Sequence, residues 1–317
     1  MSKKAFFFID DVIWVFRDLT RQRPASLFDN PFLKVLKEVH DNYGAKVQLN
    51  VFYRTDFYYG NDEFTLADMT DAYKAEWEEA SDWLKLGFHS KQEFPDYPWV
   101  NASYEDVKAV FEDIHGEICR FAGEKTFAWY TVPHWLSFSK EGCRALADCG
   151  IKAMTVTTGP VQDYSGDPSS LPYGHAGRVL QNRQPETKVF SPDMTTLAPG
   201  SNGILSTIGI YGYNHIVDAD RQSQETVTTA PDPDTGMRFK ANSPGKHTLN
   251  TFSIDQLDAL FAPQLEQDYL CFLTHEQYSY PDYFAYNSDE GDKIRRACQL
   301  AAEHGFTFIH GEEMVEA

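Results

Sequence analysis

The stretch that decides the fold is Ala5-Phe6-Phe7-Phe8-Ile9-Asp10-Asp11, in which five apolar residues run directly into two adjacent aspartates. The pattern recurs as three more strand-like runs that end at a histidine: residues 85–88 before His89, 126–133 before His134 and 269–274 before His275. In a barrel of parallel strands, the carboxyl ends of all the strands open into one mouth, where such folds place their polar sites. The four endings therefore predict one site with side chains of the kind that bind divalent metals.

Strand-like and helix-like patterns alternate over most of the chain. The expected strands cover residues 5–9, 46–53, 85–88, 126–133, 151–157, 269–274 and 306–310. Apolar spacing and capping signals predict helices at residues 31–40, 65–83, 103–121, 139–150, 253–261 and 289–303. This alternation indicates an α/β protein with a parallel sheet. It fits a closed barrel or an open doubly wound sheet, although no glycine-rich phosphate loop follows any strand.

The 317 residues exceed the ~250 of a typical α/β barrel, so we expect one barrel domain over residues 1–317 that carries an insertion. Residues from about 159 to 251 break the alternation, since they are rich in Pro, Gly, Ser, Asp and Thr. Short β-like pieces occur there at residues 188–190 and 203–211. We interpret this segment as a β-rich lobe or long loop over the barrel mouth.

The composition argues against several kinds of partner. A formal net charge of −19 disfavours nucleic acid and anionic membranes, because both require basic patches. No stretch approaches the ~20 apolar residues of a membrane span, and the first apolar run is too short for a signal peptide. The five cysteines lack zinc-knuckle spacing, which indicates reduced structural thiols. A cytoplasmic protein with a neutral or cationic small-molecule substrate is the expectation.

The adjacent carboxylates of Asp10 and Asp11 cannot both be buried and charged without a cation, because their repulsion raises one pKa strongly. A metal resolves this conflict when one carboxylate binds it and the other stays available as a base. A helix N-cap or an exposed turn would also explain the pair.

The three histidine endings also have candidate roles. His89 is a suitable zinc ligand at a strand end, and Glu93 would lie near it if the segment turns helically. His134 ends the next strand, and His275 is followed by Glu276, which could orient the imidazole ring. Each histidine alone fits a structural role, but their common placement favours a shared site.

The strand-end motifs resemble those of NodB-type polysaccharide deacetylases, which form carbohydrate esterase family 4. Phe8-Ile9-Asp10-Asp11 resembles the first motif of the family, Gly87-Phe88-His89-Ser90 the second and Leu273-Thr274-His275 the last, in the same order. The resemblance covers residues 5 to 315 apart from the insertion. It implies a distorted (β/α)7 barrel, here with a β-rich insertion.

The resemblance also implies roles for individual residues. Asp10 would be the general base and His275 the general acid, while Asp11 and His89 would bind the metal. The implied activity is that of a metal-dependent hydrolase that removes an N-acetyl group from an amino sugar or polysaccharide precursor.

Two positions depart from the family pattern. The family has a second histidine four residues after the first, where this chain has Glu93, and its arginine-bearing third motif falls at residues 129–135, which contain no arginine. We expect His134 to be the third ligand of a zinc ion, with Glu93 as the alternative. We also expect Trp135 and Tyr53 to contact the carbohydrate substrate.

Two other functions stay open. The chain could be a catalytically inactive carbohydrate-binding barrel, as the missing arginine allows. It could also be a barrel glycoside hydrolase that pairs Asp10 with Glu276 or Glu312.

Overall fold

The computed structural model describes residues 3–55, 63–93, 98–99, 102–136, 138–156, 231–241, 247–283 and 285–314. Its strands are β1 (Lys4–Val12), β2 (Val47–Phe52), β3 (Leu84–Ser90), β4 (Phe127–Ala128), β5 (Tyr130–Thr131), β6 (Ala153–Val156), β7 (Arg238–Ala241), β8 (His247–Thr248), β9 (Tyr269–His275) and β10 (Thr307–Phe308).

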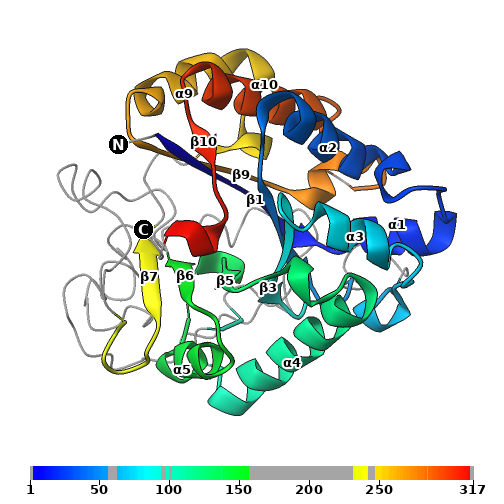
Figure 1. The fold of residues 1–317 in the computed structure, drawn as a ribbon, viewed down its shortest axis with the longest axis vertical. Coiled ribbons are helices and arrows are strands. Elements are labelled where there is room, and N and C mark those ends of the chain that lie inside the picture. Colours follow the sequence, from blue (N-terminus) through cyan, green and yellow to red (C-terminus); the bar gives the residue numbers. More distant parts are fainter. Residues whose placement is uncertain are drawn as a thin grey trace.

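All the strands pair in parallel. One sheet has the order β4-β3-β2-β1-β9-β8, with β10 beside the start of β1, and a second has the order β5-β6-β7. Only Trp129 separates β4 from β5, so the second sheet continues the wall of the first. The strands form the inside of a barrel-like fold with the helices outside (Figure 1), which confirms the α/β barrel prediction.

The helices are α1 (Trp14–Gln22), α2 (Pro31–Tyr43), α3 (Lys74–Ala80), α4 (Tyr104–Phe121), α5 (Lys140–Asp148), α9 (Leu257–Leu265) and α10 (Glu290–Glu303). Serine side chains begin two of them: Ser103 Oγ accepts from the Asp106 amide at 3.1 Å and Ser139 Oγ from the Gly142 amide at 2.9 Å. Gly44, at a φ of 68°, ends α2. These boundaries confirm the capping signals, whereas α1 had no predicted counterpart.

The predicted helix over residues 65–83 is too long, since α-helix forms only at Lys74–Ala80. This segment contains a single 3₁₀ turn at Leu66–Asp68 and then the short helix α3. Arg120 explains the break, because its guanidinium donates to the carbonyls of Leu66 at 2.9 Å and Met69 at 2.8 Å. These tertiary hydrogen bonds override the local helical propensity of the segment.

Side chains of β1 alternate between the two sides of the barrel wall. Phe6 and Phe8 pack inside the barrel with Tyr130, whereas Phe7 and Ile9 belong to the core between the strands and the helices. Asp10 therefore continues the inward-facing row of β1.

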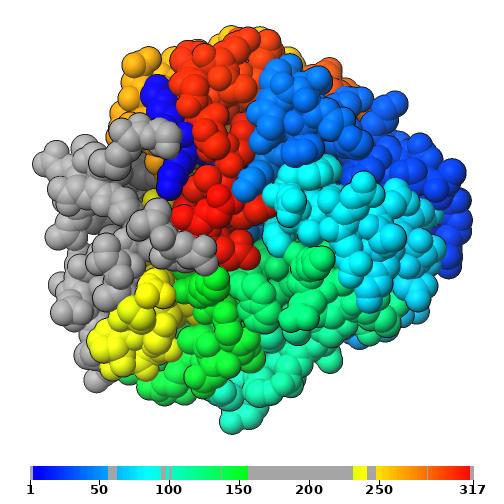
Figure 2. Space-filling model, in the orientation of Figure 1, coloured from blue at the N-terminus to red at the C-terminus, as the bar shows by residue number. Residues whose placement is uncertain are grey.

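The C-terminal residues close the end of the barrel at which the strands begin. There, β10 pairs with Lys4 and Ala5, and the 3₁₀ turn Gly311–Met314 follows it. Figure 2 shows this red segment filling the centre of one face of the molecule. Glu312 lies in this turn and its carboxylate accepts from the Trp129 amide at 2.5 Å. The strand ends that carry the predicted site lie at the other end.

The predicted insertion, residues 159–251, lies mostly outside the described residues, including its β-like pieces at 188–190 and 203–211. Its last part contributes β7 and β8, which pair with β6 and β9. Of the helices that the structure describes, none has the length and apolar character needed to cross a membrane.

Candidate metal centre

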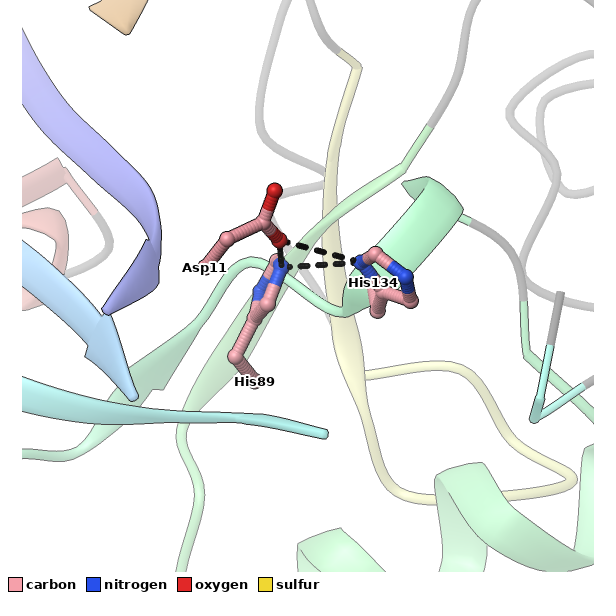
Figure 3. Close-up of side chains that lie close together, drawn as sticks. All are labelled: Asp11, His89 and His134. Carbon is pink, nitrogen blue, oxygen red and sulfur yellow. Dashed lines mark hydrogen bonds and ion pairs between the residues drawn. The ribbon is translucent and has the colours of Figure 1, made fainter. Parts of the chain in front are cut away.

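Three of the predicted site residues meet at the carboxyl ends of β1, β3 and β5. Asp11 Oδ1 lies 3.1 Å from His89 Nε2 and 3.3 Å from His134 Nδ1, and the two ring nitrogens are 3.2 Å apart. All three side chains are buried. Figure 3 shows them pointing at one another from separate segments, and among the described residues they form the group that could hold a metal ion.

A β-bulge brings Asp11 into this group. Ile9 pairs with Leu49 and Val12 with Val51, so β1 has one extra residue against β2. Asp11 is the extra residue, and its backbone has a left-handed conformation with a φ of 63°. Regular alternation would turn adjacent side chains to opposite faces. The bulge instead lets Asp10 and Asp11 both reach the barrel mouth.

A second strained turn places His134. Trp135 and Leu136 follow it with φ values of 61° and 54°, and the Leu136 amide donates to the Pro133 carbonyl at 2.7 Å. Left-handed conformations of residues other than glycine cost about 1–3 kcal/mol each and concentrate at functional sites. With Asp11, these two account for three of the four such residues in the described part of the chain.

Backbone carbonyls orient the two imidazole rings. His89 Nδ1 lies 2.5 Å from the Val132 carbonyl oxygen, and His134 Nε2 lies 2.9 Å from the Glu93 carbonyl oxygen. A carbonyl only accepts hydrogen bonds, so these nitrogens carry the ring hydrogens. In the neutral rings, His89 Nε2 and His134 Nδ1 then direct their lone pairs at Asp11 Oδ1. This orientation by carbonyls is typical of metal-binding histidines.

Without a cation, the Asp11 carboxylate is stabilised by a ring N–H directed at it. Burial acts to raise the pKa of Asp11, but the His134 and His89 rings hold the pKa well below its usual range. Burial lowers the pKa of His89, which favours its neutral ring. A carboxylate oxygen and two imidazole nitrogens converge in this buried space, and a cation bound by all three would take the place of a ring proton facing Asp11.

The predicted proton-transfer residues flank the group. Asp10 Oδ1 lies 3.8 Å from His89 Nδ1 and accepts a hydrogen bond of 2.6 Å from Asn50 Nδ2. His275 Nε2 lies 4.0 Å from Asp11 Oδ2. Asp10 and His275 are also direct partners in the pairing of β1 with β9, so the two side chains reach the mouth from neighbouring strands.

The suggested role of Glu276 in orienting His275 is wrong. The Glu276 carboxylate accepts from the backbone amides of Ile13, Trp14 and Val15, at the start of α1. His275 Nδ1 instead lies 2.9 Å from Asn250 Oδ1.

The other predicted residues divide between the site and its surroundings. Glu93 contacts His134 through its backbone carbonyl, and its carboxylate is outside the group that could hold a metal. The Trp135 ring stands edge-on to the His134 ring, with centroids 6.1 Å apart. Tyr53 packs against the main core, and burial with the carboxylates of Asp113 and Glu117 raises the pKa of its hydroxyl; its contact with a substrate stays a prediction.

Sequence reasoning missed three amides that contact the site. Gln277 Nε2 donates to Asp11 Oδ2 at 2.9 Å, Asn50 donates to Asp10, and Asn250 contacts His275. A signal existed for Asn50, because Val47-Gln48-Leu49-Asn50-Val51 places two amides on one face of a buried strand. Gln277 also stands two residues beyond a strand-end histidine.

A pocket lies beside the group. Its walls include Asp11, Trp14, Phe52, Arg54, Glu93 and Gln277. The pocket therefore combines aromatic surface with charged and amide groups next to the Asp11 carboxylate.

No protein-family model and no curated protein matches the chain. Among solved structures, a 4-alpha-glucanotransferase from Thermococcus litoralis aligns with a TM-score of 0.53 and 10% identity over 100% of this chain. The chain spans 40% of the length of that protein. At this identity the similarity concerns the fold alone.

Two further matches are family 4 carbohydrate esterases, the family that the strand-end motifs resemble. The Xyl-CE4 domain of a multidomain xylanase from the hindgut metagenome of Trinervitermes trinervoides aligns with a TM-score of 0.41 and 10% identity, over 100% of this chain and 91% of that one. A cobalt-bound acetyl xylan esterase from Clostridium thermocellum aligns with a TM-score of 0.31 and 13% identity, over 83% and 92%.

Proposed function

We propose that this protein is a metal-dependent hydrolase that removes an N-acetyl group from an amino sugar or polysaccharide precursor. The observation that carries the proposal is the convergence of Asp11 Oδ1, His89 Nε2 and His134 Nδ1 in one buried space. Side chains that converge in this way, with their rings fixed from behind by carbonyls, form a site prepared for a cation.

The donor set fits a divalent transition metal. Two imidazole nitrogens and one carboxylate oxygen are ligands typical of catalytic zinc sites, which keep a further position open. When bound, the ion would supply Lewis acidity, which polarises an acyl carbonyl and lowers the pKa of water from 15.7 to about 7. We take zinc as the ion in this proposal.

The flanking residues supply the proton transfers. Asp10 takes a proton from the water whose oxygen adds to the acyl carbon. His275, in its protonated form, gives a proton from Nε2 to the amide nitrogen as the C–N bond breaks. The products are acetate and a free amine. Asn250 accepts from His275 Nδ1 and so keeps Nε2 directed at the mouth.

The pocket suits the acyl end of a carbohydrate. Asp11 and Gln277 line it beside the aromatic rings of Trp14 and Phe52, so an acyl group that enters it lies next to the metal ligands. In the proposal, Trp135, whose ring stands edge-on to that of His134, stacks against a sugar ring. The cytoplasmic location expected from five reduced cysteines is also part of the proposal.

A glycoside hydrolase would need a second carboxylate opposite Asp10, and neither candidate is available for this role. The Glu276 carboxylate binds three backbone amides, and Glu312 lies at the opposite end of the barrel from Asp10. Neither residue can form the required pair with Asp10 across a substrate.

Metal binding and turnover test the proposal together. The purified protein is stripped with a chelator and titrated with zinc or cobalt by calorimetry, and acetate release is measured with N-acetylglucosamine oligomers. We expect Asp11→Asn to abolish both metal binding and acetate release. Asp29→Asn is the control, since Asp29 only accepts from the Ser26 amide in a capping box.

Two results would contradict parts of the proposal. A protein that neither contains nor binds a divalent metal has no metal-dependent activity. A protein that binds zinc and the oligomers but releases no acetate is a carbohydrate-binding barrel and not a hydrolase.

A further inference from the structure

Two buried amides stand in a row inside the barrel, next to Asp10. Gln48 and Asn50 alternate with apolar residues along β2, so both point inward, and neither is exposed to solvent. Asn50 Nδ2 donates to Asp10 Oδ1 at 2.6 Å. Gln48 Nε2 donates to Asn50 Oδ1 at 2.7 Å and to the Tyr130 carbonyl at 3.0 Å. These hydrogen bonds link Asp10 to the backbone of β5.

The backbone end of this row sets its direction. The Tyr130 carbonyl only accepts, so Gln48 must present its NH₂ group there. The same NH₂ group then faces the Asn50 oxygen, which leaves the Asn50 NH₂ group directed at Asp10. Flipping either amide would bring two oxygens together in a buried space, at the cost of unsatisfied polar groups.

Gly87 leaves the space that the amides occupy. It is the pairing partner of Asn50 on β3. A Cβ atom at Gly87 would lie 2.9 Å from Gln48 Nε2, 3.3 Å from Asn50 Oδ1 and 3.4 Å from the Tyr130 oxygen. The first of these distances is shorter than real Cβ contacts, so any other residue at position 87 would displace Gln48. The positions of the two amide side chains thus require glycine at position 87 for steric reasons, apart from the hydrogen bonds.

We propose that Asn50, held by Gln48, is the positioning residue of Asp10. This inference rests on the proposed function, in which Asp10 is the base. The Asn50 amide occupies Oδ1 and prevents rotation of the carboxylate. The water O–H bond then breaks with its proton going to the Asp10 carboxylate, while the bonding electrons stay on the oxygen that attacks.

Kinetics on the zinc-loaded protein test the positioning role. Asn50→Asp keeps the shape of the side chain but turns a donor into an acceptor, and Asn50→Leu keeps the volume without any donor. We expect both to lower kcat by about 10–100-fold, the scale of a misplaced catalytic group, with KM and the zinc Kd within about threefold. Gln48→Leu, which only frees Asn50 to flip, should have a smaller effect, about 3–10-fold.

The control is Asn30→Leu. Asn30 is also buried, but its side chain caps α2 and makes no contact with the site. It should lose thermal stability and keep kcat. If Asn50→Asp and Asn50→Leu both turn over substrate within twofold of the natural protein, Asn50 only fills space and the inference is wrong.

A second measurement does not depend on turnover. In protein labelled with ¹⁵N at asparagine, the side-chain NH₂ signal of Asn50 is assigned by its loss in Asn50→Leu. We expect this signal to shift in Asp10→Ala and to exchange slowly with solvent in the natural protein. If the Asn50 signal does not shift in Asp10→Ala, the inference is wrong even if the enzyme is active. If the signal shifts but the protein releases no acetate, Asn50 still positions Asp10 and the proposed function is wrong.

Discussion

Replacing Glu276 with alanine should remove a large part of the stability of the fold. Its carboxylate is fully buried and joins the end of β9 to the first turn of α1. Oε2 accepts from the amides of Ile13 at 2.7 Å and Trp14 at 2.8 Å, and Oε1 accepts from the Val15 amide at 2.7 Å and the Tyr280 hydroxyl at 3.2 Å. No intrahelical partner exists for amides in the first turn of a helix.

The number of stranded donors gives the size of the effect. Glu276→Ala leaves three buried N–H groups without an acceptor, at about 1–3 kcal/mol each. Water that enters the vacated space will recover part of this, so we expect a loss of about 3–5 kcal/mol. That is a substantial share of the 5–15 kcal/mol by which folded domains are stable. Glu276→Gln keeps one acceptor oxygen and should cost about 1–3 kcal/mol.

Urea unfolding at pH 8 measures these losses. Burial raises the pKa of Glu276 to about 7, so the carboxylate is ionised at this pH. Glu313→Ala is the control, because the Glu313 carboxylate also accepts a backbone amide, that of His310, but its side chain is 42% exposed. It should cost less than about 1 kcal/mol. A loss below 1 kcal/mol for Glu276→Ala would refute the reasoning and return Glu276 to the list of catalytic candidates.

Three further predictions concern the metal ligands, the pH dependence and the packing. In isothermal titration with zinc, His134→Ala should raise the Kd by more than the roughly 10–100-fold typical of residues that only orient ligands. Glu93→Gln should change the Kd by no more than about threefold. The reverse order would make Glu93 the ligand. Burial lowers the pKa of His310 to about 4, so the unfolded state binds more protons between pH 4 and 6.5 and stability must fall as the pH drops through that range. Urea unfolding at pH 4 and at pH 6.5 measures this loss of stability, and His310→Gln should reduce it by about 3 kcal/mol. An unchanged loss in the variant would exclude His310 as its source. Gly311→Ala would bring a Cβ into the Tyr130 ring and should lower stability by about 1–3 kcal/mol, whereas Gly116→Ala, in α4 with open space around it, should raise stability by up to about 1 kcal/mol. Thermal unfolding that ranks the two variants equally would contradict the packing argument.

The elements of the fold follow from local patterns wherever packing agrees with them. Ser103 and Ser139 begin their helices as expected, because a serine cap acts within a single turn. The helix prediction fails after Thr65, because Arg120, from a distant helix, binds carbonyls that would otherwise accept hydrogen bonds within a helix. The split of one expected strand into β4 and β5 likewise depends on how the barrel closes, which no local pattern records.

The site was more predictable than its supports. Asp11, His89 and His134 lie together because strand ends in a parallel barrel must meet, and that rule needs only the positions of the residues along the chain. The direction of a side chain follows different rules. Glu276 and His275 are neighbours in sequence, yet they point to different partners, Trp14 and Asn250 among them. Such pairings depend on three-dimensional distances that spacing cannot supply.

The bulge in β1 has a consequence for anyone who wishes to transfer this site to another barrel. Copying the two aspartates onto a regular strand would send Asp10 into the barrel and Asp11 beneath the surrounding helices, where its charge would meet apolar side chains. The host strand must therefore be lengthened by one residue against its neighbour, as Ile9 and Val12 show against Leu49 and Val51. The transferable unit is a backbone irregularity together with its acids, and a design that corrects the irregularity would lose the site.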